Sequence, residues 1–342
     1  MKRILILETT CDETAAAVVT DSLEVLASVV ASQDELHKRY GGVVPEIASR
    51  AHVERILPVI DQTLRRANLT VGQLDAVAVA NTPGLAGSLL VGLSAAKALC
   101  LALDVPLVAV NHLHAHIYAC RMAAGRDVFP CLGLIVSGGH TSLYRCRTPL
   151  EFELLGGTID DAAGEAFDKV ASLLGLPFPG GPAIERVARG GNPRAFALPR
   201  PLVDSDRLDF SFSGLKTAVR YRISQPGAAA PSAPLDERAV ADLAASFQEA
   251  VVDCLVAKTM LAVERTALDV LCVGGGVAAN GRLRDRMAQE TARRGIELVI
   301  PPLKLCTDNA VMGAIAIERL KAGLTEPLTL DVAPGLLRGT VG

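Results

Sequence analysis

Two segments of the sequence share one layout, in which an apolar strand-like run passes through a polar turn into a second strand-like run. The first covers residues 4–19 and the second covers residues 132–144. A polar hairpin turn offers backbone N–H groups and hydroxyls to an anion, and glycine lets the chain approach a phosphate closely. One such hairpin would be ordinary sheet structure, but two in one chain predict a duplicated domain that grips a nucleotide from both sides.

The rest of the chain alternates helical patterns with short runs of valine, isoleucine and leucine. Its 342 residues suggest two domains of ordinary size, at roughly 150 residues each. Apolar runs such as 76–80, 132–136 and 270–273 are short and continuous, as buried strands are, so we predict an α/β fold. Residues 224–234 are rich in proline, glycine, alanine and serine, and we expect a surface loop between two helices there.

Composition excludes several classes of protein. No apolar stretch reaches the roughly 18 uninterrupted residues of a membrane span, and the N-terminal apolar run meets Glu8 too soon for a signal peptide. We therefore expect a soluble, cytoplasmic protein that does not bind a membrane. The eight cysteines show no Cys-x-x-Cys spacing, which indicates buried thiols in a reducing compartment. A net charge of −3 gives no overall footprint for nucleic acid, which local patches or partner proteins would have to hold.

Three of the six histidines are clustered, at His112, His114 and His116. A β-branched apolar run precedes them, helix formers follow them, and Asn111 is well placed as an N-cap. We therefore predict a strand-to-helix turn that puts His112 and His116 on one helical face. Imidazole suits zinc, iron, nickel and copper, so the pair is a candidate for two metal ligands. Polar surface at a helix start is the alternative.

A third ligand must come from elsewhere in the chain, and Asp308 is the best candidate. It follows a strand-like run and precedes a helix of small residues, so a helix N-cap is an equally good interpretation. Metallopeptidases that share the histidine spacing need a glutamate beside the first histidine as the base, and this chain has Leu113 there. The pattern favours a metal that positions a substrate over a peptidase.

A third glycine cluster, at residues 273–280, follows a strand-like run and opens a helix. It matches the dinucleotide-binding fingerprint only in part, because the nearby acid, Glu297, begins the next strand instead of ending it. A glycine turn against which an adenosine packs, with Asn280 available to its polar atoms, fits better. The sequence has no P-loop motif, which excludes that class of nucleotidase.

Three acidic residues, Asp161, Glu165 and Asp168, have the i, i+4, i+7 spacing that would align them on one face of a helix. A solvated helix face and contact with a ribose or other substrate group are both consistent with this pattern.

Taken together, these residues resemble the bacterial family of tRNA adenosine threonylcarbamoyltransferases, TsaD, once labelled glycoproteases. The resemblance spans nearly the whole chain, and so many motifs in one order make it specific. The motifs that carry it are residues 8–14, 40–52, 82–85, 112–116, 136–141, 160–169, 210–216, 274–280 and 306–309. Two positions depart from the common pattern, with His114 where many relatives carry glutamate and Leu7 where glycine is usual. His114 is therefore a candidate for an extra or displaced ligand.

The resemblance implies an actin-like, Hsp70-like and sugar-kinase-like α/β fold of two related subdomains with a nucleotide cleft between them. The first subdomain would comprise residues 1–128 and 309–342, and the second would comprise residues 129–308. One metal ion per subunit, iron(II) or, in vitro, zinc or another divalent metal, would be held by His112, His116 and Asp308. The adenylate substrate would contact Ile135, Val136, Ser137, Gly138, Gly139, Asp168, Gly181 and Asn280.

The implied reaction transfers a threonylcarbamoyl group from threonylcarbamoyl-AMP to the N6 amine of the adenosine next to a tRNA anticodon, and releases AMP. Asp12, Glu13 or Lys216 could assist proton transfer, and the sequence gives no geometry to choose among them. The resemblance also implies two protein partners, a TsaB-like paralogue of the same fold and a TsaE-like ATPase. One alternative is an ATPase or kinase of the same fold, which would release ADP or phosphate without tRNA. Another is a silent assembly subunit, which would lack the histidine pair and Asp308.

Overall fold

The computed structural model describes residues 1–223 and 235–335, so the predicted loop at 224–234 lies outside the described residues. The chain forms two compact units. Unit 1 consists of Met1–Asp127, Thr148–Phe152 and Pro301–Gly342, and unit 2 consists of Val128–Arg147 and Glu153–Ile300.

The predicted subdomain boundary after residue 308 lies too late in the chain, because the structure returns to unit 1 at Pro301. The physical reason is a short helix, α10 (Leu303–Cys306), which packs against α4 (His112–Ala124) of unit 1. Asp308 therefore belongs to the same unit as the clustered histidines.

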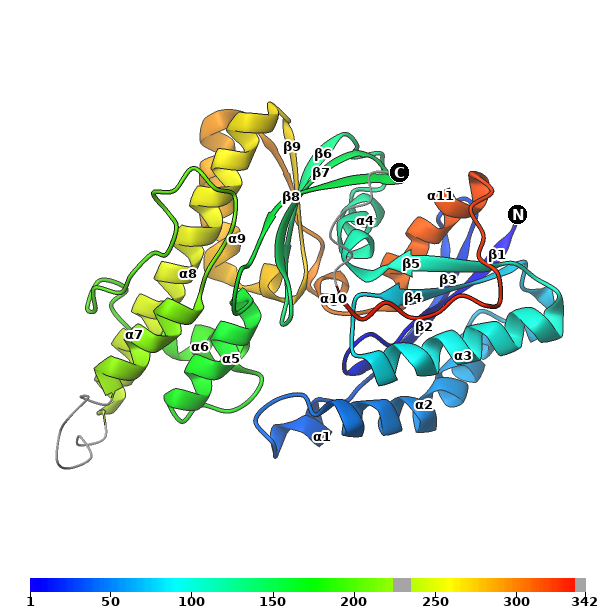
Figure 1. The fold of residues 1–342 in the computed structure, drawn as a ribbon, viewed down its shortest axis with the longest axis horizontal. Helices are drawn as coiled ribbons and strands as arrows, with labels where there is room; N and C mark the ends of the chain where they lie inside the picture. Colours follow the sequence, from blue (N-terminus) through cyan, green and yellow to red (C-terminus); the bar gives the residue numbers. More distant parts are fainter. Residues whose placement is uncertain (224–234, 336–342) are drawn as a thin grey trace. The chain divides into compact units, whose positions relative to one another are not determined.

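Unit 1 is built on a five-stranded mixed sheet in the order β3-β2-β1-β4-β5 (Figure 1). Its strands are β1 (Arg3–Glu8), β2 (Glu13–Thr20), β3 (Val25–Ser32), β4 (Ala76–Thr82) and β5 (Leu107–Asn111). Strand β1 pairs antiparallel with β2, with Leu5 opposite Val18, and parallel with β4. Both β1 and β4 are buried almost throughout, as expected for strands covered on both faces.

Helices cover both faces of this sheet. On one face, α2 (Pro45–Arg66) and α3 (Ala86–Leu103) pack in a core that includes Leu5 and Leu7. The alternate residue Ile6 points to the other face, where its Cγ2 leaves no room for a side chain at Gly313. Gly313 lies in η3 (Ala310–Ile315), which is followed by α11 (Ala316–Lys321). The smaller elements of unit 1 are α1 (Asp34–Lys38) and η1 (Val71–Gln73).

Unit 2 repeats the same strand arrangement in a second five-stranded sheet, β8-β7-β6-β9-β10. Its strands are β6 (Cys131–Val136), β7 (Thr141–Thr148), β8 (Glu151–Gly157), β9 (Val270–Gly274) and β10 (Glu297–Val299). Strand β6 pairs antiparallel with β7 and parallel with β9, as β1 does with β2 and β4. The two predicted hairpins therefore occupy equivalent places, and the predicted duplication is confirmed.

The longest helix of unit 2, α8 (Glu237–Thr266), contacts strand β6 and three other helices, α6 (Gly180–Ala188), α7 (Ser213–Ile223) and α9 (Gly281–Arg294) (Figure 1). A side-chain oxygen of Asp236 accepts a hydrogen bond from the backbone N–H of Ala239 and caps this helix. The other elements are α5 (Ala163–Leu173) and η2 (Gly276–Ala279).

One helix in the described part of the chain, α3, is long and apolar enough to cross a membrane by length and composition alone. Core helices of ordinary globular proteins pass the same test, and α3 packs against β4 and α2. Ser94 and Lys97 interrupt the apolar residues of α3, so this helix does not contain an unbroken apolar stretch as long as a membrane span.

Candidate functional site

The clustered histidines lie at the start of α4, directly after β5. The Asn111 side chain accepts hydrogen bonds from the backbone N–H groups of Leu113 and His114, which ends the strand and begins the helix. The predicted strand-to-helix turn is therefore confirmed. One helical turn separates His112 from His116, and their ring centroids lie 4.7 Å apart.

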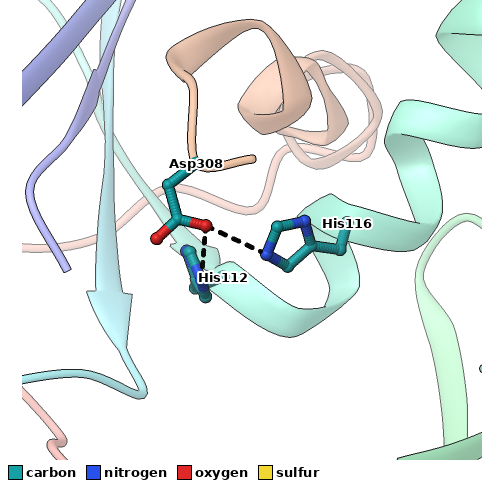
Figure 2. A group of neighbouring side chains, drawn as sticks. All are labelled: His112, His116 and Asp308. Carbon is teal, nitrogen blue, oxygen red and sulfur yellow. Dashed lines mark ion pairs between the residues drawn. The ribbon is translucent and has the colours of Figure 1, made fainter. Parts of the chain in front are cut away.

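Asp308 completes a group of three possible ligands with these histidines (Figure 2). Its Oδ1 lies 3.2 Å from Nε2 of His116 and 3.5 Å from Nε2 of His112. The alternative interpretation of Asp308 as a helix cap is wrong, because Asn309 caps η3 by accepting from the backbone N–H of Met312. The carboxylate of Asp308 is left to face the two imidazoles.

Glu8 holds His112 from the other side of its ring. Oε2 of this buried glutamate lies 3.0 Å from Nδ1 of His112, and its Oε1 accepts from the backbone N–H of Thr10. A proton on Nδ1 leaves Nε2 as the lone-pair atom that faces Asp308. Burial lowers the pKa of His112, but the carboxylates of Asp308 and Glu8 outweigh it and raise that pKa to about 9. The pocket therefore favours positive charge.

His116 supplies the test of whether a metal fits. Its side chain is fully buried, and within the described residues neither Nδ1 nor Nε2 makes a hydrogen bond. Leaving a buried polar atom without a partner is costly. A cation bound by Nε2 of both histidines and by Asp308 would remove that cost for Nε2, and two imidazoles with one carboxylate suit zinc or iron(II). The residues present therefore fit a divalent metal.

His114 lies between the two candidate ligands but outside the ligand group found among the described residues. Its ring stacks on Phe152 at a centroid distance of 3.9 Å with 7° between the planes. Burial, assisted by the guanidinium of Arg319, lowers the pKa of His114 to about 4. His114, which departs from the family pattern, therefore has a packing role in this structure, as the stacking partner of Phe152.

Asp12 and Glu13 lie on the first hairpin and form a second acidic group with Asp34, with one carboxylate oxygen of each within 4.8 Å of the others. Burial raises the pKa of Asp12. Burial and the nearby carboxylates of Asp308 and Asp12 raise the pKa of Glu13 to about 11. A pKa this far above neutral favours the protonated form of Glu13.

Lys216, the third candidate for proton transfer, belongs to unit 2 and lies on α7. Its Nζ lies 2.9 Å from Asp161, which also binds Nζ of Lys169 at 2.9 Å. The predicted acidic helix face is wrong at Asp161, because α5 begins only at Ala163. Asp161 is an ion-pair partner ahead of the helix, while Glu165 and Asp168 lie within α5.

The second hairpin presents an open, donor-rich turn between β6 and β7. Ile135 and Val136 are buried in β6, and the backbone N–H of Ser137 is bonded to the carbonyl of His140. In contrast, the N–H groups of Gly138 and Gly139 make no hydrogen bond within the described residues, and the space beside both glycines is open. Two unpaired amides on an exposed glycine turn are suited to an anion.

The start of α5 is pressed against this turn. Backbone N–H groups of Gly164 and Glu165 donate to the carbonyls of Ser137 and Gly138. A Cβ at Gly164 would come within 2.6 Å of the Ser137 carbonyl oxygen, so this close approach requires glycine.

Asp168, Gly181 and Asn280 all lie in unit 2 with this turn. Oδ1 of Asp168 accepts from the backbone N–H of Gly180 at 2.7 Å and thereby ties α5 to the start of α6, beside the open position of Gly181. Asn280 caps α9 by accepting from Leu283. The predicted glycine turn is also present, with Gly275 at φ +96° and packed against the end of β6.

Two polar residues of these sites were missed by sequence reasoning. Glu8 could have been found as an acid at the end of an otherwise apolar strand. Gln248 of α8, whose Oε1 accepts from Nδ2 of Asn280 at 2.9 Å, gives no local signal because it lies in an ordinary helical pattern.

The duplicated sheets define a protein of the actin, Hsp70 and sugar-kinase fold class, with a His-His-Asp group in one unit and a glycine-rich hairpin in the other. Solved structures agree on this fold. Component A of (R)-2-hydroxyglutaryl-CoA dehydratase from Acidaminococcus fermentans matches with a TM-score of 0.54 at 14% identity, over 94% of this chain and 100% of that chain. Full-length HypF in its phosphate- and nucleotide-bound form matches with a TM-score of 0.61 at 15% identity, over 94% of this chain and 47% of that chain.

The sequence then identifies the family within this class. The model of the family TsaD, tRNA N6-adenosine threonylcarbamoyltransferase, matches residues 24–315. Proteins of that name from Rhodopirellula baltica and Symbiobacterium thermophilum are each 53% identical to this chain, over 98% and 99% of it and over 97% and 98% of the relatives. The chain belongs to this family.

It is therefore an acyltransferase of tRNA modification, which moves a threonylcarbamoyl group to N6 of adenosine in tRNA and forms threonylcarbamoyladenosine. The sequence-based expectation of this function is confirmed, and the alternatives of a kinase, a silent assembly subunit and a peptidase are not supported.

Proposed function

We propose that His112, His116 and Asp308 hold one divalent cation per subunit, iron(II) in the cell and zinc or another divalent metal in vitro, which would anchor the threonylcarbamoyl part of the substrate. The observation that carries this proposal is His116, a fully buried imidazole whose two nitrogens make no hydrogen bond among the described residues. When bound, the cation would act as a Lewis acid toward the acyl group.

The hairpin of unit 2 has a separate task in this proposal. The free N–H groups of Gly138 and Gly139 bind the phosphate of threonylcarbamoyl-AMP and stabilise the charge that gathers on it as AMP departs. Ile135, Val136 and Ser137 shape the turn, and Asp168, Gly181 and Asn280 contact the adenosine part. An adenine amine is a poor nucleophile, so holding the adenylate in one orientation contributes to the rate.

Proton removal from the attacking amine is assigned to Asp12. Of the three candidates, Lys216 is ion-paired with Asp161, and burial together with nearby carboxylates raises the pKa of Glu13. Asp12 is the remaining carboxylate of the first hairpin.

The tRNA substrate requires help from other proteins. A chain with a net charge of −3 has little electrostatic attraction for tRNA, so local patches or partner proteins would have to hold it. The resemblance to the family suggests which partners these are, and we infer that a TsaB-like paralogue and a TsaE-like ATPase assist, in the cytoplasm and away from membranes.

The test is a reconstituted reaction with threonylcarbamoyl-AMP, unmodified tRNA, ATP and the partner proteins, followed by mass spectrometry for threonylcarbamoyladenosine. The His112→Ala, His116→Ala double variant should form no product and bind no stoichiometric metal, while its unfolding transition stays cooperative. Full activity of the double variant would show that the metal has no part in the mechanism. In the wild-type reaction, AMP should be released in proportion to the tRNA that is modified.

A further inference from the structure

Gln248 is a polar side chain in a nearly buried position on α8, only 9% exposed, with no part in the mechanism above. Its one hydrogen bond among the described residues runs from Nδ2 of Asn280 to its Oε1, at 2.9 Å. Within the described residues, Nε2 of Gln248 is not one of the fully buried polar atoms that lack a partner, so it remains accessible. The amide group of Gln248 leaves its Nε2 donors unused.

The orientation of this amide follows from a backbone donor. The N–H of Leu283 can only donate, so the Asn280 atom 3.0 Å from it must be the oxygen Oδ1. The other end of Asn280 is then the donor Nδ2, and Gln248 must present Oε1 to it. Nε2 of Gln248 is thereby fixed on the side away from Asn280, with two N–H donors.

The surroundings of Gln248 are those of the proposed adenosine contacts. Asn280 follows the glycine turn of η2, and the next residue, Gly281, donates from its backbone N–H to Oε1 of Glu185 on α6. The same helix α6 begins beside Asp168 and carries Gly181. Helices α6 and α9 both pack against α8, and the bond to Asn280 places Gln248 next to one of the proposed adenosine contacts.

We propose that Gln248 is a base-recognition residue, which donates a hydrogen bond from Nε2 to a ring nitrogen of the adenine of the adenylate. Adenine offers acceptors at N1, N3 and N7, and an N–H donor is the group that pairs with them. This inference rests on the proposed adenylate site at Asn280. It adds the residue that reads the base, while Asn280 holds that residue in position.

Two substitutions separate recognition from support. Gln248→Glu keeps an oxygen toward Asn280 and replaces the free donors by an acceptor, whereas Gln248→Met keeps the approximate volume and removes both functions. The probes are AMP and its 1-deaza, 3-deaza and 7-deaza analogues, each of which lacks one ring acceptor. Binding of each probe to the full-length protein is measured by calorimetry, and thermal unfolding of each variant is recorded in parallel.

The wild type should bind one of the three analogues roughly five- to tenfold more weakly than AMP, the value of one hydrogen bond. Both variants should bind AMP more weakly by a similar factor and should no longer distinguish that analogue from AMP. If Gln248→Glu binds AMP as the wild type does and keeps the same preference, Gln248 only supports Asn280 and the inference is wrong. Gln248→Glu decides the question alone if Gln248→Met fails to fold. If the wild type does not bind AMP at all, the proposed adenylate site fails first and the inference fails with it.

Discussion

His52 illustrates how a single side chain can fix a turn that carries catalytic candidates. Its Nε2 lies 3.0 Å from the carbonyl oxygen of Cys11, which can only accept, so the ring proton resides on Nε2. Nδ1 then accepts from the hydroxyl of Thr14 at 2.8 Å. The fully buried ring thus holds both sides of the Asp12-Glu13 turn in its neutral form.

The neutral form of His52 predicts a pH dependence of stability. Burial lowers the pKa of His52, and the unfolded chain has a histidine pKa of about 6.5. Between these two pKa values the unfolded state binds more protons than the folded state, so the free energy of unfolding falls as the pH drops below about 6.5.

Urea unfolding of the wild type and of His52→Gln between pH 5 and pH 8 isolates this contribution, because the other histidines are common to both proteins. We expect the wild type to lose more stability than the variant as the pH falls. Parallel curves for the two proteins would mean that folding does not shift the pKa of His52.

At the level of elements, α5 and the second hairpin form one contact. A Cβ at Gly164 would lie 2.6 Å from the Ser137 carbonyl oxygen and 2.8 Å from Cα of Gly138, and neither backbone atom can move without reshaping the turn. Gly164→Ala should therefore lower stability by about 1–3 kcal/mol and weaken AMP binding.

Gly214→Ala on α7 is the matched control, because a Cβ there meets nothing within 4 Å. It should leave both the unfolding temperature and AMP binding close to those of the wild type. Equal behaviour of the two variants would contradict the contact between α5 and the turn.

The same elements show which parts of the site a sequence can predict. The helix start at His112 was predictable because its signals are local, an apolar strand followed by an asparagine cap. The start of α5 was misplaced because Asp161 is held outside the helix by Lys169 and Lys216, and Lys216 is distant in sequence. The Gln248 amide could not be predicted, because only the packing of α8 on α9 brings it to Asn280.

At the scale of the whole molecule, the repeated hairpins predicted the duplicated architecture, but the return of the chain to unit 1 at Pro301 was placed too late. That return brings Asp308 to the histidines, so a metal held there would join two distant parts of the chain within unit 1. A ligand that binds only the folded state stabilises it by about 2.7 kcal/mol at a concentration one hundred times its Kd.

We therefore expect a chelator to lower the unfolding temperature, and added zinc, or iron(II) without oxygen, to restore it. The control variant is His114→Phe, which keeps an aromatic ring opposite Phe152 and should respond to metal as the wild type does. The His112→Ala, His116→Ala variant should show no response in calorimetry. A lost response in His114→Phe would instead make His114 a ligand.

The position of Asp308 also has a consequence for synthesis of the chain. As the protein leaves the ribosome, His112 and His116 emerge first, and all of unit 2 follows before Asp308 does. The helix η3, which packs against the face of the first sheet that carries Ile6, emerges just as late. While unit 2 is being translated, the first sheet of unit 1 therefore lacks the residues that cover one of its faces. A chain truncated after Ile300 would also lack Asp308, the third member of the His-His-Asp group.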